Sequence, residues 1–175
     1  MGRLISLAQH DGPGVRHFSG TTTYTTEFEV PAARLSSSRQ QVLDLGDVQV
    51  IAEVTLNGRN LGILWKAPFS VAVGDALKPG RNELRIRVAD LWVNRLIGDQ
   101  NFADDCQWTT NTGSTAKGRG LVEIPAWVIH NTPRPSPERK AFVSWQWPHL
   151  KNKQLLPSGL LGPVTLVSES ETEMR

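Results

Sequence analysis

Apolar and polar residues alternate along much of the first half of the chain. In the segment 83–88, Leu84, Ile86 and Val88 fall on one face, and the charged residues between them fall on the other. The segment 21–30, "TTTYTTEFEV", alternates in the same way and is rich in Thr and aromatic residues. A period of two is that of a β-strand with one buried face. We therefore expect two strands here, with Leu84, Ile86 and Val88 in the core.

Turn signals divide the rest of this region into further strands. The segment 48–56 ends at Asn57-Gly58, a dipeptide typical of tight hairpins, and the segment 59–65 follows at once. Val54 and Leu56 share one face of the first of these strands, so they should join the core. Two more strands are predicted at 69–73 and 164–167. Single helical turns are predicted at Ala32–Ser36 and Asp75–Leu77.

Many short strands with little helix are typical of an all-β fold, an antiparallel β-sandwich. We expect one sandwich domain over residues 21–167, preceded by an irregular N-terminal segment at 1–20 and followed by a polar tail at 168–175. Residues 91–156 lose the periodicity and gain Trp, Pro, Gly and Asn. A jelly roll is favoured because such a long excursion then forms irregular loops at one end of two packed sheets.

Composition excludes several classes of protein. The net charge is only +2, and the basic residues between Lys117 and Lys153 are spread out, so no nucleic-acid partner is expected. No apolar run approaches 18 residues, so no membrane span is expected, and the N-terminus lacks a signal-peptide pattern. The single cysteine, Cys106, rules out an internal disulfide framework. That fits a reducing cytoplasm and a disulfide-free secreted bacterial protein equally well.

The segment 91–100, "LWVNRLIGDQ", mixes bulky aliphatic with polar residues directly after a strand. Its aliphatic side chains can close the open end of the sandwich. Trp92 offers a flat apolar ring, and Asn94, Arg95 and Asp99 offer directional hydrogen bonds. Sugars need that mixture, because their C–H faces stack on aromatic rings and their hydroxyls bind planar polar groups. Two interpretations stay open: the polar residues tie down the long loop, or they contact a ligand.

Other tryptophans are candidates for the same role. Trp108 lies in a polar stretch, where an indole must either pack or bind. Trp145 and Trp147 alternate in "SWQW", so both face one side of a strand and are either a stacking platform or core filling. Trp65, at the end of a predicted strand, is expected in the core or at a sheet edge.

Carboxylates in the excursion suggest two kinds of chemistry. If the chain is an enzyme, Asp99, Asp104, Asp105 and Glu123 are the candidate acid and base of a glycoside hydrolase, but no spacing selects a pair. Adjacent Asp104 and Asp105 could instead share a structural calcium ion, which prefers oxygen ligands. No other cofactor is expected, and the four His residues are too scattered to indicate a metal site.

The order of several motifs resembles known carbohydrate-active proteins. The segment 53–88, with its strand–NG–strand–PF–strand–LKPG–N–strand rhythm, is similar to the sugar-binding β-sandwich of glycoside hydrolase family 2. A closer resemblance is to the C-terminal β-sandwich of glycoside hydrolase family 106 α-L-rhamnosidases. It is carried by six pieces in the same order: "HFSGTTTYTTEFEVP", "LDLGDVQVIAEVTLNG", "LGILWKAPF", "LWVNRLIGDQ", "IPAWV" and "LLPSGLLGPV".

The resemblance implies a galactose-binding-like jelly roll, whose parent proteins are secreted or periplasmic bacterial enzymes with a separate catalytic glycosidase domain. Two functions therefore remain open. One is a non-catalytic module that binds carbohydrate, for which Trp92, Asn94, Arg95, Asp99, Trp108, Trp145 and Trp147 are the candidate ligand-binding residues. The other is a small stand-alone glycoside hydrolase that acts on rhamnosides or related glycosides through its loop carboxylates. A purely structural domain is the third alternative.

Overall fold

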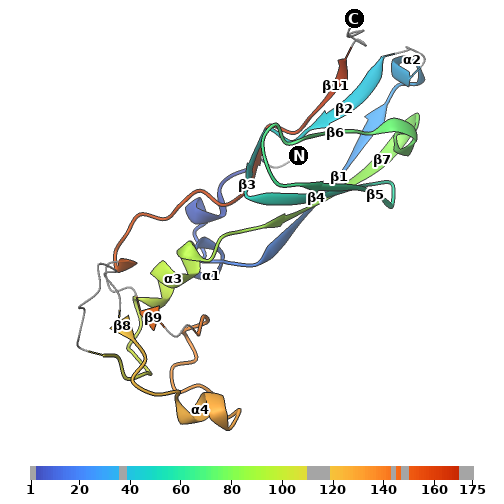
Figure 1. Ribbon diagram of the computed structural model, residues 1–175. Coiled ribbons are helices and arrows are strands. Elements are labelled where there is room, and N and C mark those ends of the chain that lie inside the picture. The colour runs from blue at the N-terminus through green and yellow to red at the C-terminus, as the bar shows by residue number, and fades with distance from the viewer. Residues whose placement is uncertain (1–2, 36–38, 110–118, 143–144, 147–149, 170–175) are drawn as a thin grey trace, which may run out of the picture.

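The computed structural model describes residues 3–35, 39–109, 119–142, 145–146 and 150–169, and it confirms an antiparallel β-sandwich. One sheet has the strand order β1-β7-β4-β5, and the opposing sheet has the order β11-β2-β6. Figure 1 shows the two layers, with the remaining chain extending from one end of the sandwich. The strands of the first sheet are β1 (Thr21–Val30), β7 (Gly80–Ala89), β4 (Ile51–Leu56) and β5 (Arg59–Leu64). Those of the second are β11 (Thr165–Glu169), β2 (Gln40–Asp44) and β6 (Ser70–Ala72).

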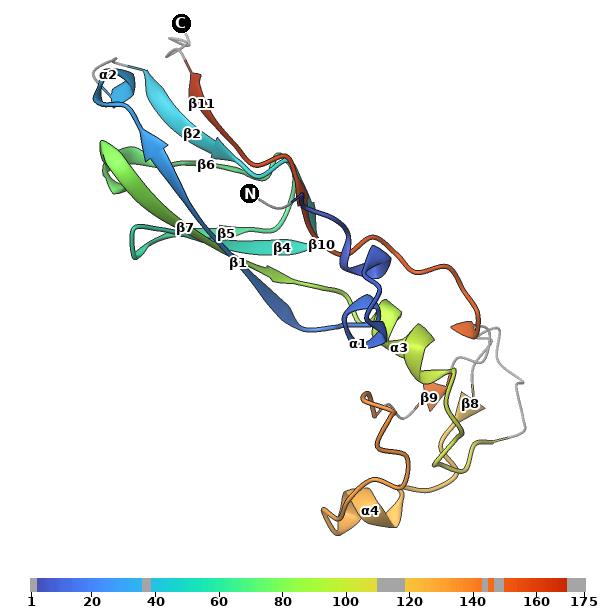
Figure 2. The same cartoon turned by 180° about the vertical axis from the view of Figure 1, so that it is seen from behind.

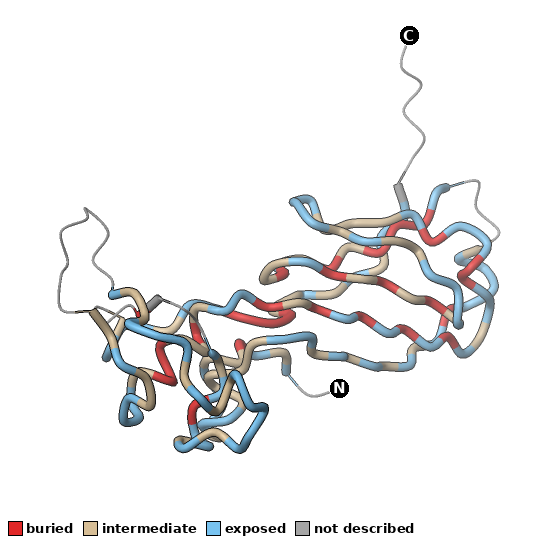
Figure 3. Tube along the Cα trace, turned by 60° about the horizontal axis from the view of Figure 1, so that its bottom comes forward, coloured by how far each residue is buried: buried red, intermediate tan, exposed pale blue. Residues whose placement is uncertain are grey.

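Alternation in the sequence becomes alternation of burial. Leu84, Ile86 and Val88 on β7 are at most 2% exposed, and Val54 and Leu56 on β4 are fully buried, as predicted. In Figure 3 buried residues alternate with exposed ones along the strands of the sandwich. The β4–β5 hairpin turns at Asn57-Gly58, where both residues have positive φ, of 50° and 79°. Two successive left-handed residues match the twist of paired strands, so this turn fixes the register.

All six predicted strand segments contain strands, but the prediction missed β2, β10 (Gly159–Gly162) and the two-residue strand β8 (Arg119–Gly120). β2 was not predicted because Gln41, Val42 and Leu43 are all buried, so buried and exposed residues do not alternate along it. Gln41 points to the same face of the strand as Leu43, and its side-chain oxygen accepts a hydrogen bond from Arg34 of α2 (Ala32–Leu35). β10 pairs with β3 (Asp47–Gln49), and its two glycines at positive φ read as a turn.

The expectation that helix is confined to single turns was wrong at one place. α3 (Val93–Asp99) has seven residues, about two turns. It has no side-chain N-cap and contains Gly98, so its sequence lacks the usual helix signals. Shorter helical turns are η1 (Leu7–Gln9), α1 (Pro13–Arg16), η2 (Gly74–Ala76) and α4 (Ala126–Ile129). The turns expected near Ala32 and Asp75 are present as α2 and η2. No helix in the described part of the chain is long and apolar enough to cross a membrane.

The excursion lies beyond α3, at the end of the sandwich opposite the C-terminus (Figure 2). It holds α4 and a two-stranded sheet of β8 (Arg119–Gly120) and β9 (Trp145–Gln146). β11 runs to Glu169, two residues into the segment expected as a polar tail. A cavity of about 410 Å³ opens between β1 and β11 and is lined mainly by aliphatic and aromatic side chains such as Tyr24, Phe28 and Leu166.

Shortening Ile86 to Ala should cost about 2–5 kcal/mol of unfolding free energy, because the buried side chain leaves a cavity between the two sheets. Urea titration followed by fluorescence measures the loss. Arg85→Ala is the matched control, since that neighbour faces solvent and should change stability by less than about 0.5 kcal/mol. A loss below about 0.5 kcal/mol for Ile86→Ala would contradict the register of β7.

Candidate functional site

α3 is fastened to the sandwich through Asn94. Its amide is 2% exposed, donates to the Leu156 carbonyl at 2.8 Å and accepts from the Leu156 N–H at 2.9 Å. These two bonds satisfy both ends of the side chain against the strand-like segment that leads into β10. Asn94 therefore makes the backbone contacts that the structural interpretation of this segment predicts.

Asp99, at the other end of α3, holds the distant segment 140–141. Its carboxylate is 2% exposed, and it accepts the Lys140 N–H at 3.1 Å and the Ala141 N–H at 2.7 Å. The Arg95 guanidinium lies one helical turn back and pairs with the same carboxylate at 2.8 Å. Four residues from two remote parts of the chain thus meet at one buried charge. A buried carboxylate needs this many partners, since an unpaired one would be very costly.

Gly98 lets the N-terminal segment approach this turn of α3. A β-carbon at that position would lie 2.7 Å from Cγ of His17 and 2.8 Å from Nη2 of Arg95. The imidazole and the guanidinium therefore sit against the bare helix backbone. As a result, the residues that follow α1 are brought close to Arg95.

A second group of ion pairs links segments within the excursion, residues 91–156. Asp105 is paired with the Arg134 guanidinium, which also donates to the Ala141 carbonyl at 3.0 Å. Asp104 accepts hydrogen bonds from Arg139 at 3.1 Å and from Gln146 at 2.8 Å. Arg134 further lies over the Trp127 ring, 5.1 Å from its centroid. Arg134 thus binds backbone carbonyls of residues 139 and 141, and Asp99 binds the N–H groups of residues 140 and 141.

These contacts determine what the carboxylates can do. Burial alone raises the pKa of Asp105, but the hydrogen bonds and charge of Arg134, helped by Cys106 and Arg139, outweigh it and the pKa is lowered. A carboxylate held ionised in this way is a poor general acid. Burial and the Asp105 charge raise the pKa of the Cys106 thiol to about 11, so it stays protonated at neutral pH.

The same contacts do not fit the calcium ion expected at Asp104 and Asp105. Both carboxylates already face guanidinium groups, and a cation would have to displace them. Within the described ranges, no group of three or more His, Cys, Asp or Glu side chains is arranged to hold a metal. Glu123 is exposed and lies apart from these contacts in the chain before α4.

One cavity gathers chemistry suited to a ligand. It has a volume of about 240 Å³ and lies where three segments meet: the residues just before β1, the first turn of α3 with its N-cap, and the segment 140–142. It is lined by Ser19, Trp92, Arg95, Lys140, Ala141 and Phe142, and we call it the joint cavity. Trp92 is 67% exposed although it is a large aromatic residue. The joint cavity therefore combines two aromatic rings, a hydroxyl and two cations at one solvent-accessible place.

Of the predicted ligand-binding residues in the described part of the chain, Trp92 and Arg95 line the joint cavity. Asp99 pairs with Arg95 and residues 140–141, whereas Asn94 faces Leu156 and lines a different cavity. Trp108 is partly buried and forms an isolated bridge with Leu121, away from that cavity. The backbone of Trp145 pairs with Gly120 in the small sheet, and Trp147 lies outside the described residues. Trp65 follows the edge strand β5 and is exposed, in line with the sheet-edge alternative.

Sequence reasoning missed Ser19, Lys140 and Phe142. Ser19 lies far before Trp92 in the sequence, Lys140 and Phe142 lie more than 40 residues after it, and none of the three belongs to a motif. One signal was available in the sequence. Asp99 is a carboxylate in an apolar stretch, and it needs hydrogen-bond donors that its sequence neighbours could not supply.

Comparison with known proteins places the chain in a family. Residues 15–161 match the family described as glycosyl hydrolase 2 galactose-binding domain-like. A protein of Formosa agariphila named "Putative beta-glucuronidase" is 44% identical over 164 residues, which is 93% of this chain and 13% of that protein. The solved rhamnosidase from Novosphingobium sp. PP1Y is 34% identical over 97% of this chain and 13% of its own, with a TM-score of 0.64. A β-glucuronidase from Bifidobacterium dentium, 32% identical, aligns with 49% of this chain and 14% of its own, at a TM-score of 0.44.

The sandwich and these matches define a galactose-binding-like domain of the kind found in glycoside hydrolase proteins. The chain belongs to the glycosyl hydrolase 2 galactose-binding domain-like family. It spans about an eighth of the length of the relatives with which it aligns almost fully, at 13% in each case.

Replacing Asp99 with Asn should release residues 140–141 from α3. The substitution leaves Arg95 buried without its counter-charge, a change that typically costs about 3–5 kcal/mol. Hydrogen exchange should accelerate by at least about tenfold at the Lys140 and Ala141 amides, because 1.4 kcal/mol corresponds to tenfold. Asp47→Asn, at an exposed position on β3, is the control. Unchanged exchange at both amides would show that Asp99 does not anchor the segment.

Asp90, between β7 and α3, should make the fold less stable as pH rises. It is buried and accepts the Gly159 N–H at 2.6 Å. Burial raises the pKa of its carboxyl above 3.8, although hydrogen bonds from Gly159 and Thr22 oppose the shift. A raised folded-state pKa means that the contribution of Asp90 to stability is greatest below pH 3.8 and declines as pH rises through the folded pKa.

Asp90→Asn keeps an oxygen for Gly159 and removes the charge. The gain in unfolding free energy relative to wild type should therefore grow between pH 3.5 and pH 7, measured by urea titration at each pH (about half-unit steps). Asp75→Asn, at an exposed site in η2, controls for general charge effects. A gain that stays constant or shrinks with pH would overturn this assignment.

Proposed function

We propose that this domain is a non-catalytic carbohydrate-binding module of a larger glycoside hydrolase, and that the joint cavity holds the sugar. The observation that carries the proposal is the joint cavity itself. Trp92 and Phe142 offer apolar rings for the C–H faces of a pyranose, and Ser19, Arg95 and Lys140 offer groups that bind hydroxyls. Asp99 and Arg134 hold α3 and residues 140–141 together, so this part of the cavity is organised before a ligand arrives.

The contacts of the carboxylates favour binding over catalysis. Glycoside hydrolysis needs one carboxyl group as an acid and a second as a base or nucleophile on either side of the scissile bond. Asp99 and Asp105 are 3% exposed at their side chains and are engaged by Arg95 and Arg134. Neither can reach a substrate without breaking a buried ion pair. Asp104 is also engaged, by Arg139 and Gln146.

For the parent protein we propose an enzyme related to the family 106 α-L-rhamnosidases, with the catalytic groups on a separate domain. Support comes from the similarity to the Novosphingobium rhamnosidase across 97% of this chain. In such a protein the module would hold glycan near the catalytic domain. A domain that serves only as structural support is the competing proposal, and it predicts no saccharide affinity at all.

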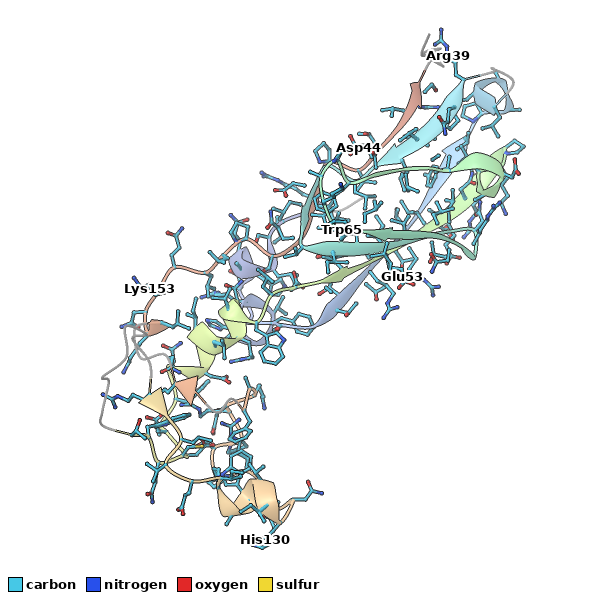
Figure 4. The ribbon with its side chains drawn as sticks, viewed as in Figure 1. Arg39, Asp44, Glu53, Trp65, His130 and Lys153 are labelled. Carbon is cyan, nitrogen blue, oxygen red and sulfur yellow. The ribbon has the colours of Figure 1, made fainter. Side chains whose placement is uncertain are left out.

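A glycan screen of the domain should find a ligand with a Kd in the millimolar to micromolar range, about 4–8 kcal/mol, because a small wet cavity buries little area. Trp92→Ala should then weaken binding by roughly fivefold, equivalent to about 1 kcal/mol of ring stacking. Trp65→Ala is a matched control, since that indole is 66% exposed against 67% for Trp92 and belongs to the sandwich (Figure 4).

Isothermal titration with the ligand from the screen measures both variants, and circular dichroism checks their folding. Equal affinities for Trp92→Ala and wild type would remove the joint cavity as the binding site. A screen without any saccharide ligand would leave the structural role as the better proposal.

A further inference from the structure

The joint cavity carries an excess of positive charge. Two of the side chains that line it, Arg95 and Lys140, are cationic, and no acidic residue is among the described residues that line it. The nearest carboxylate in contact with them, Asp99, lies beneath and is 3% exposed at its side chain. Its oxygens are already occupied by Arg95 and by the N–H groups of 140 and 141. Asp99 therefore balances one of the two cations and leaves the other.

Lys140 is the cation that stays uncompensated. Its Nζ donates to the Pro137 carbonyl at 2.6 Å, a neutral acceptor that positions the ammonium without cancelling its charge. None of the ion pairs in the described part of the chain includes Lys140. Its backbone N–H is fixed by Asp99, so the residue cannot swing away with a mobile loop.

Arg95 offers donors in a fixed geometry. Its guanidinium is 16% exposed, pairs with Asp99 through Nη2, and has a buried Nε that lacks a hydrogen-bond partner among the described residues. A planar fork of N–H groups matches the oxygen pair of a carboxylate or a sulfate far better than a single hydroxyl. An unsatisfied buried donor also makes an anionic acceptor favourable at this point.

We propose that the joint cavity selects a saccharide with an anionic substituent, with the ring against Trp92 and the anionic group between Arg95 and Lys140. This inference rests on the proposed function, because it specifies the class of sugar for the same cavity. A uronic-acid carboxylate and a sulfate ester share the required chemistry.

Six methyl β-glycosides test the inference on the whole chain: galactoside, galacturonide and galactoside 6-sulfate, with the three corresponding derivatives of glucose. Within each set only the substituent at C6 changes, so the neutral sugar is the control for ring contacts. Isothermal titration at low salt should give the uronide or the sulfate an affinity about three- to fivefold above that of its neutral partner, as expected of one partly exposed charge pair. Whichever of the uronide and the sulfate binds more tightly identifies the anionic group that the cavity prefers. Raising the salt to about 0.5 M should erase that advantage.

Lys140→Gln should abolish the advantage of the anionic sugar over its neutral partner, measured as the ratio of the two affinities within that variant. Lys153→Gln is the matched control, because Lys153 is an exposed lysine in the C-terminal segment that does not line the joint cavity (Figure 4). Its binding should equal that of wild type. Both substitutions are at exposed side chains, so both variants should fold.

The possible outcomes separate this inference from the proposed function. Equal binding of neutral and anionic sugars, or tighter binding of the neutral ones, overturns the anionic preference while the carbohydrate-binding function stands. An anionic advantage that survives in Lys140→Gln overturns the assignment of Lys140. If none of these sugars binds while the glycan screen yields a neutral ligand, the inference fails alone. If the screen also yields nothing, the proposed function fails with it.

Discussion

The buried carboxylate of Asp99 is the contact on which the end of this domain depends. A charge at 2% exposure is tolerable only when several donors surround it, and here they come from α3 and from a segment about 40 residues further along the chain. The sheets can close without this contact, since their core consists of alternating aliphatic residues. The excursion depends on it, because Ile97 is the one buried hydrophobic residue among the described residues between 91 and 156. Polar anchoring replaces a hydrophobic core in this part of the molecule.

The polar contacts of Asp99 and Arg134 explain the position of the joint cavity. Asp99 fixes the N–H groups of residues 140 and 141, and Arg134 fixes the Ala141 carbonyl. Trp92 is the N-cap residue of α3 and Arg95 lies on that helix, one turn before Asp99, so the same anchor holds both near Lys140 and Phe142. One buried charge therefore supports the site and, by neutralising Arg95 alone, leaves it with a net positive charge.

The sandwich could be predicted from the sequence because its information is local. A period of two on β1 and β7, and the Asn57-Gly58 turn, specify strands and register without knowledge of the partner strands. β2 was missed because three successive residues, Gln41, Val42 and Leu43, are buried, and one of them is a polar residue that pairs with Arg34. α3 was missed because its stability comes from tertiary partners of Asn94 and Asp99 rather than from capping or propensity.

The site was only half predictable for the same reason. Trp92 and Arg95 stand out locally as an aromatic and a cation in an apolar stretch, and both line the joint cavity. Ser19, Lys140 and Phe142 become neighbours only through long-range contacts, which no spacing in the sequence encodes. Asp104 and Asp105 looked like free carboxylates for calcium or catalysis because their partners, Arg139 and Arg134, lie about 30 residues away.

The central claim is that the joint cavity binds a saccharide, and an NMR titration of the isotope-labelled domain tests it most directly. Addition of the ligand found by a glycan screen should shift the Trp92 indole signal and the amides of Ser19, Arg95, Lys140 and Phe142, while the core amides of β7 stay unchanged. Shifts confined to another surface, such as the cavity between β1 and β11 or the exposed indole of Trp65, would contradict the account.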